Sequence, residues 1–167
     1  MNLYILKEKQ ENITLEELYK KFSSDIFKYS FSILKDYEEA KDTVQEVFMK
    51  YAESETIYKK NCSPKTWLLI ITRNYCFNKL KNKNFNLLKI EDQILSDYTT
   101  PNYDEIISIE HAIKKLPSEY SELIFLRDFE GYSYKEIAEI AELSLENVKI
   151  KLFRARQQLR KFLRNEI

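Results

Sequence analysis

Basic side chains gather close to the C-terminus of a chain whose 167 residues carry a formal net charge of zero. Residues 146–161 contain one acid, Glu146, and three of the six arginines of the chain. Their basic residues are Lys149, Lys151, Arg154, Arg156, Arg160 and Lys161. Arginine binds phosphate through two parallel hydrogen bonds, and at base edges arginine or lysine pairs with guanine while asparagine pairs with adenine. We therefore predict that this stretch binds DNA. The alternative is a basic amphipathic helix on a protein or membrane surface.

A helix-turn-helix is predicted to position these side chains. Ser133 and Glu136 form a capping box before a short helix in YKEIAEIAEL. A tight turn follows at Glu142–Leu143, and Ser144 then caps a long final helix. The inward face of this helix is Val148, Leu152, Ala155 and Leu159, and its first turns present outward Glu146, Asn147, Lys149, Ile150 and Lys151. The helix before this unit opens at Pro117 and ends at Gly131, where the backbone should be left-handed.

Helix signals also dominate the first half of the chain. Thr14 with Glu17, and Asp36 with Glu39, form capping boxes, while Ser63 followed by Pro64 starts a third helix that should run to about Lys81. The expected buried stripes are Leu15, Leu18, Phe22, Ile26, Tyr29 and Ile33 in the first helix, then Ala40, Val44, Val47, Phe48 and Tyr51 in the second. In the third helix we expect Trp67, Ile70, Ile71 and Tyr75 to face the core. The fold class is therefore all-α.

Basic and acidic residues lie in two separate stretches in the middle of the chain. From Arg73 to Lys89 the chain has five basic residues and no acid, whereas from Glu91 to Glu110 it has six acids and no base. The segment EDQILSDYTTPNYDE has weak periodicity and a proline, which indicates a linker between two small helical domains. The acidic linker is expected to be solvated chain, or alternatively to lie against the basic helices and screen them from nucleic acid.

Composition excludes several function classes. One glycine and one histidine leave no glycine-rich phosphate loop and no HExxH zinc site, so we expect neither an enzyme nor a metal or cofactor. No apolar run reaches the roughly 20 residues that span a bilayer, and we see no signal peptide. Cys62 and Cys76 match neither a metal-ligand spacing nor a disulfide framework, which favours a reducing cytoplasm.

The C-terminal half resembles the promoter-reading domain of extracytoplasmic-function (ECF) sigma factors. The resemblance is carried by Leu116-Pro117, by EGYSYKEIAE, by Val148-Lys149 and by RARQQLRKFL. LuxR-type response regulators share part of this pattern, so this half alone does not separate the two families.

The N-terminal half distinguishes ECF sigma factors from LuxR-type response regulators. DYEEAKDTVQEVFMKYAES resembles the helix of ECF sigma factors that binds the polymerase clamp, and SPKTWLLIITRNYCFNKLKNKN resembles the helix that meets the melted promoter. The two halves together cover about residues 15–163 in the order of the family. The resemblance implies residues 10–88 as a polymerase- and −10-binding domain, 89–107 as a linker and 108–167 as a −35-binding domain.

The resemblance also implies roles for individual residues. Contacts to core RNA polymerase fall to Asp42, Gln45, Glu46, Phe48 and Met49. Contacts to the −10 element fall to Tyr58, Lys59, Lys60, Asn61, Lys65, Arg73, Asn74, Asn78 and Lys81, with the loop TIYKKNC holding a flipped-out base. Contacts to the −35 element fall to Ser144, Glu146, Asn147, Lys149, Ile150, Lys151, Arg154 and Arg156. The implied partners are core RNA polymerase, promoter DNA and an anti-sigma factor, which could hold the protein at the membrane.

The sequence departs from the family pattern at several positions. Asn78 stands where the family has aspartate, and Lys81 where it has arginine. Glu142 replaces the glycine of the turn, where a left-handed residue would cost about 1–2 kcal/mol, so we expect a locally different turn. Glu146-Asn147 replaces Gly-Thr, which should change the −35 sequence that is read.

Two alternatives remain. A stand-alone helix-turn-helix regulator would bind DNA tightly as a dimer without polymerase, although the N-terminal half has no alternating βα pattern. A helical adaptor would bind only proteins and leave the basic helix solvated.

Overall fold

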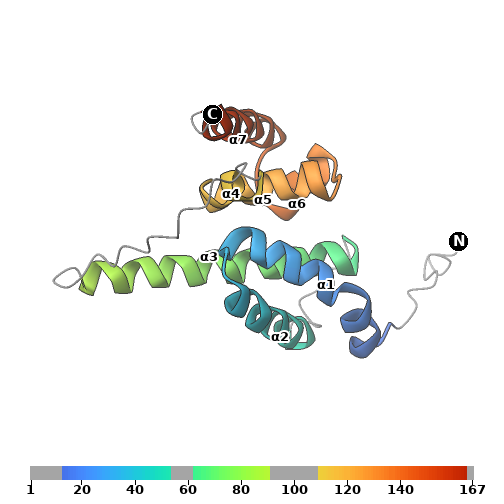
Figure 1. The fold of residues 1–167 in the computed structure, drawn as a ribbon. Helices are drawn as coiled ribbons and strands as arrows, with labels where there is room; N and C mark the ends of the chain where they lie inside the picture. The colour runs from blue at the N-terminus through green and yellow to red at the C-terminus, as the bar shows by residue number, and fades with distance from the viewer. Residues whose placement is uncertain (1–12, 54–61, 91–108, 165–167) are drawn as a thin grey trace, which may run out of the picture.

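The protein is described by a computed structural model that covers residues 13–53, 62–90 and 109–164. Seven α-helices and one π-helical segment make up these ranges, and no strand occurs in them, so the all-α prediction is confirmed. The elements are α1 (Leu15–Leu34), α2 (Tyr37–Glu53), α3 (Pro64–Ile90), α4 (Ile109–Lys114), α5 (Ser118–Ile124), η1 (Phe125–Phe129), α6 (Tyr134–Ile140) and α7 (Leu145–Arg164). Figure 1 shows α1–α3 on one side of the molecule and α4–α7 on the other.

The predicted caps form. The Thr14 and Ser133 hydroxyls accept the backbone N–H three residues on, and Glu17 and Glu136 complete the two capping boxes. The Ser63 Oγ accepts from the Thr66 N–H at 3.1 Å. The Ser144 Oγ accepts from the Asn147 N–H at 3.1 Å, as expected for the start of the last helix. Local sequence therefore sets where four of the helices begin.

The N-terminal half is three mutually packed helices, α1, α2 and α3. Its fully buried side chains include Ile26 and Tyr29 of α1 and Val47 of α2. In α3 the buried side chains are Leu68, Leu69, Thr72 and Cys76. The expected core face of α3, namely Trp67, Ile70, Ile71 and Tyr75, is only half-buried, so that prediction was wrong by about one residue of register. The helix also continues past Lys81 to Ile90.

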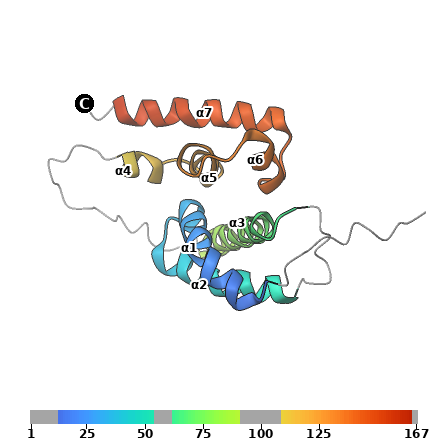
Figure 2. The same ribbon diagram turned by 90° about the vertical axis from the view of Figure 1, so that its right-hand side faces the viewer.

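The C-terminal half places α7 over α4, α5 and α6. Val148, Leu152 and Ala155 of α7 are buried, as predicted, and Leu159 is half-buried. In both views α7 lies on the side of this half that is farthest from α1–α3 (Figures 1 and 2). The helix that was expected to run unbroken from Pro117 widens into the π-helical η1, where the Glu130 N–H donates to the Phe125 carbonyl at 3.0 Å.

The two halves are in contact. α5 packs on α1, α6 packs on α3, and buried residues of both halves belong to one apolar cluster. Two of the −10 candidates on α3, Lys65 and Arg73, lie against residues of the opposite half, namely Tyr132 and Glu122.

Two residues with positive φ flank α6, and they predict opposite effects of substitution. Gly131 has φ +76° and Glu142 has φ +53°, so the glutamate adopts the left-handed turn that we expected it to alter. Gly131→Ala should lower the free energy of unfolding by about 1–2 kcal/mol, because an added Cβ meets no atom within 4 Å and only the backbone is strained. Glu142→Gly should raise it by up to about 1 kcal/mol, since the relief of strain exceeds the entropy that glycine adds to the unfolded chain. Urea unfolding of the two variants checks this; a shift in the same direction would contradict it.

Candidate nucleic-acid interface

The outer face of α7 presents polar and basic side chains to solvent, together with the exposed apolar side chains of Ile150 and Phe153. Exposed positions of the predicted −35 set are Ser144, Glu146, Asn147, Lys149, Ile150 and Arg154. Within the described part of the chain, Lys149 and Arg154 make no ion pair, so both cations are available to a ligand. Since Ser144 already accepts a hydrogen bond as the cap, its hydroxyl serves mainly to fix the start of the helix. This geometry suits a recognition helix, whose first turns meet base edges.

Two cations of the same set are engaged within the C-terminal half. The Lys151 Nζ lies 2.5 Å from Glu119 of α5. Arg156 donates to both carboxylate oxygens of Asp128, at 2.6 and 3.2 Å, and this hydrogen bonding raises the pKa of the guanidinium. Both basic residues are half-buried, so they anchor α7 to the helices beneath it. The structure therefore divides the predicted −35 residues into exposed side chains and anchors.

The predicted −10 residues of α3 divide in the same way. Asn74, Asn78 and Lys81 are exposed, and their spacing of four and three residues places them on one side of the helix. Lys65 instead pairs with Asp25 of α1 at 2.8 Å, and its ammonium lies 5.6 Å from the ring centre of Tyr132 in the C-terminal half. Tyr58, Lys59, Lys60 and Asn61 lie outside the described residues.

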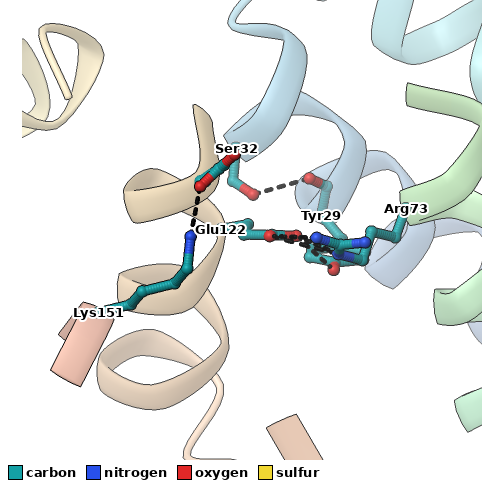
Figure 3. A network of polar contacts seen from close by, with 6 residues as sticks. Tyr29, Ser32, Arg73, Glu122 and Lys151 are labelled. Carbon is teal, nitrogen blue, oxygen red and sulfur yellow. Dashed lines mark hydrogen bonds and ion pairs between the residues drawn. The ribbon is translucent and has the colours of Figure 1, made fainter. Parts of the chain in front are cut away.

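Arg73, the remaining −10 candidate, binds a buried carboxylate. Its guanidinium donates to both oxygens of Glu122 at 3.2–3.3 Å. The central carbon of the guanidinium also lies 4.7 Å from the centre of the Phe77 ring. The side chain of Glu122 is 1% exposed and also accepts from the Tyr29 hydroxyl at 3.1 Å (Figure 3). Tyr29, Arg73 and Glu122 form what we call the buried triad. Burial and the adjacent carboxylate raise the pKa of Tyr29, so the phenol keeps its proton and donates it.

Sequence reasoning missed the role of Glu122. One signal was present, because Glu122 precedes Leu126 by four residues and so places an acid on the apolar stripe of its helix. Nothing in the local pattern shows that its partners come from positions 49 and 93 residues earlier.

Glu122 predicts a pH dependence of stability. Burial raises the pKa of this carboxyl from 4.5 to about 7, against the lowering effects of Arg73 and Tyr29. Because the folded state holds the proton more tightly, this contribution is complete below pH about 4.5 and is lost as the pH rises through about 7. The loss should be about 3 kcal/mol at most. Urea unfolding from pH 5 to 8 should show the wild type losing stability relative to Glu122→Gln, which cannot titrate. A constant difference would contradict the prediction.

An acidic and polar face lies on α2. Asp42 and Gln45 are exposed, Glu46 is half-buried, and Met49 is 58% exposed, so these four side chains form one surface. Phe48 does not belong to it. Its side chain is 4% exposed and packs on Tyr19 with ring centroids 5.0 Å apart, because it occupies the buried stripe of α2. Phe48 is therefore a core residue of α2, and its assignment as a polymerase contact was wrong.

The described ranges hold no group of three histidine, cysteine or acidic side chains that could bind a metal ion. They also hold no helix that is long and apolar enough to span a membrane.

Comparisons with known proteins agree on one family. Residues 18–85 match the family described as Sigma-70 region 2, and residues 106–159 match Sigma-70, region 4. The RNA polymerase sigma factor SigV of Bacillus subtilis (strain 168) is 30% identical over 138 residues, which cover 81% of this chain and 82% of SigV. The ECF RNA polymerase sigma factor SigX of the same organism is 26% identical over 162 residues, covering 90% of this chain and 84% of SigX. The fold is similar to that of the sigma factor RpoE, solved in complex with the anti-sigma factor NepR from Bartonella quintana. The TM-score is 0.73 at 19% identity, covering 89% of this chain and 96% of RpoE.

Proposed function

Since this chain belongs to the extracytoplasmic-function family of RNA polymerase sigma factors, we propose that its α7 reads the −35 element and its α3 reads the −10 element of promoters. The protein binds core RNA polymerase and directs promoter-specific transcription initiation. The observation that carries the assignment of α7 is that Asn147, Lys149 and Arg154 are all exposed in the first half of a capped helix. We assign the protein no reaction of its own, because the polymerase performs the chemistry.

The finer assignments follow the exposed side chains. At the −35 element, Glu146, Asn147, Ile150 and Lys149 are placed to meet base edges in the major groove, with Arg154 one turn further on for a phosphate or a guanine. At the −10 element, Asn74, Asn78 and Lys81 form the exposed row of α3. Asn78 in place of aspartate removes a negative charge beside DNA, which favours phosphate contact.

The α2 face is the proposed docking surface for core polymerase. Asp42, Gln45 and Glu46 supply negative and polar groups for a basic partner surface, and Met49 supplies an exposed apolar contact. Met is enriched in protein interfaces, where acidic residues of one partner meet basic residues of the other. We further propose that the protein acts in the cytoplasm and that an anti-sigma factor sequesters it. Two proteins of similar fold have been solved with partners: the sigma factor RpoE with the anti-sigma factor NepR, and CnrH with the cytosolic domain of CnrY.

Run-off transcription tests the proposed function. Core polymerase would be incubated with and without the protein on genomic fragments, including the region upstream of its own gene. Discrete new start sites that depend on the protein support the proposal and reveal the promoter. If folded protein yields no new transcripts and instead selects a palindromic site without polymerase, the function is that of a stand-alone regulator.

A further inference from the structure

A cavity of about 410 Å³ lies beside α1, and we call it the aromatic cavity. One wall comes from α1 and its C-cap, and the other from α4, α5 and η1; Figure 2 shows α1 beneath α4 and α5. Its volume falls within the range of about 300–1,000 Å³ that is typical of small-molecule sites. None of its lining residues belongs to the sets assigned to polymerase, to the −10 element or to the −35 element. The proposed function therefore leaves this cavity without a role.

Two pairs of phenylalanine rings supply its apolar lining. On α1 the ring centroids of Phe27 and Phe31 lie 6.2 Å apart, and the ring planes differ by 12°. On η1 the centroids of Phe125 and Phe129 lie 6.4 Å apart, and the planes differ by 17°. The second pair belongs to a π-helical segment, and such segments occur frequently at functional sites. Phe129 is 58% exposed, so a flat aromatic molecule in the cavity would cover a ring that the fold leaves open to water.

The charged residues of the described lining are three lysines, with no acid among them. Lys28 and Lys114 are exposed, and neither makes an ion pair with the side chains that the structure describes. The half-buried Lys35 ammonium donates to the backbone carbonyls of Lys114 and Leu116 and to no carboxylate in the described ranges. Burial lowers the pKa of Lys35, because the charged form loses solvation. An anion in the cavity would supply the negative charge that its lining lacks.

The uncharged polar groups of the lining are two serine hydroxyls. The Ser32 hydroxyl donates to the Tyr29 carbonyl at 2.7 Å (Figure 3). Ser121 is fully buried, and its Oγ has no hydrogen-bond partner among the described residues. Burial of an unpaired hydroxyl is unfavourable, so one polar atom of a ligand at this wall would stabilise it. A nucleotide would need more partners than this, because its sugar hydroxyls and base edge all form hydrogen bonds.

We propose that the aromatic cavity binds a small aromatic carboxylate, whose ring packs against the two phenylalanine pairs and whose carboxylate lies near Lys28 and Lys114. Such a molecule has one flat apolar body and one negative charge, and the lining offers partners for these two features and for little else. The site uses no residue of the proposed promoter or polymerase surfaces, so its test needs neither DNA nor polymerase.

Calorimetric titration of the full chain with β-naphthoate tests the proposal. We expect saturable binding of one molecule with a dissociation constant below about 1 mM. The uncharged β-naphthamide and the cationic β-naphthylmethylamine have nearly the same shape and should bind at least about threefold more weakly. Absence of saturable binding at several times the expected concentration overturns the proposal. Equal binding of acid and amide also overturns it, because the lysines then select no anion, and so does tighter binding of adenosine monophosphate.

A pair of exposed phenylalanines locates the ligand. Phe129→Ala removes a ring of the η1 pair and should weaken β-naphthoate binding about fivefold. Phe153→Ala on α7 is the matched control, because this side chain is 61% exposed and lies outside the cavity, and it should change nothing. Helical circular dichroism checks that both variants fold. Equal weakening by the two substitutions would mean that the ligand binds exposed rings in general, which overturns the proposal.

A pair of lysines on α1 tests the recognition of charge. Lys28→Gln should weaken β-naphthoate binding about threefold and leave β-naphthamide binding unchanged. Lys21→Gln is the control, since Lys21 is also exposed and lies seven residues earlier, about 10 Å along the helix axis. At an ionic strength of 0.15 M this distance exceeds the Debye length of about 8 Å, so the control should bind β-naphthoate as the wild type does. If Lys28→Gln weakened the acid and the amide equally, the carboxylate would not lie near Lys28 and the proposal would be overturned.

Discussion

Replacing Arg154 by alanine should remove most promoter-directed transcription and leave both the fold and polymerase binding intact. The side chain is exposed on the outer face of α7 and makes no ion pair with the described residues. Its loss therefore costs the folded protein almost nothing, whereas a bidentate contact to guanine or phosphate is worth about 1–3 kcal/mol. We expect transcript yield at limiting protein to fall about 10–100-fold.

Arg160→Ala is the matched control for this prediction. It is also an exposed arginine of α7, and it lies six residues further along, or about 9 Å along the axis. Its substitution should change transcript yield by less than about threefold. The measurement is run-off transcription on one promoter at several salt concentrations, with polymerase binding followed separately. If the two alanine variants lost the same activity, the helix would contribute general positive charge and no positioned contact.

Lys149→Ala extends the argument to the first turns of the helix, since Lys149, like Arg154, is exposed and makes no ion pair with the residues that the structure describes. A change that weakens all promoters equally would place its ammonium on a phosphate. A change that alters which −35 sequence is preferred would place it on a base.

Sequence predicted the parts of this fold that depend on neighbouring residues. Caps such as those of Ser133 and Ser144 need only a hydroxyl and a backbone N–H three residues away, and both form as expected. The left-handed backbone at Gly131 was also predictable from local sequence, because glycine adopts a positive φ without the steric cost of a Cβ. The buried stripe of α7 was correct at Val148, Leu152 and Ala155, whose spacings of four and three residues place them on one side of a helix.

The register of α3 could not be predicted in this way. The run from Trp67 to Ile71 is apolar at all five positions, so its periodicity does not select a face, and the packing of α3 against α1, α2 and α6 decides which side is buried. The buried residues are Leu68, Leu69 and Thr72, and the predicted Trp67 and Ile71 lie at the edge.

The candidate site was predictable as a set of residue types but not as a set of free side chains. Asn74 and Arg154 are exposed, whereas Arg73, Lys151 and Arg156 are bound to acids of other helices. These acids lie 28 to 49 residues away in the sequence, and no local pattern predicts such pairings. For Phe48 the two predictions conflicted. The resemblance suggested a residue that contacts polymerase, whereas the apolar stripe of α2 predicted a buried residue, and the side chain is buried.

Substitutions on the α2 face should weaken polymerase binding without unfolding the protein. Asp42→Arg reverses an exposed charge, so it leaves the core intact and places a cation against a basic partner surface. Juxtaposed like charges at an interface cost several kcal/mol, and we expect the dissociation constant for core polymerase to rise about 10–100-fold.

Met49→Ala tests whether the same surface has an apolar centre. The side chain is 58% exposed and is flanked one turn earlier by Gln45. Truncating an interface residue that becomes fully buried costs more than about 1 kcal/mol, whereas truncating a solvated side chain costs almost nothing. If α2 docks on polymerase, Met49→Ala should weaken binding by about tenfold and leave the urea midpoint unchanged.

Glu16→Arg, the same charge reversal on α1, serves as the control for Asp42→Arg and should bind as the wild type does. If Asp42→Arg and Glu16→Arg weakened binding equally, polymerase binding would depend on the net charge of the protein and not on the α2 face. A docking face requires that an acid within it matters more for binding than an acid outside it.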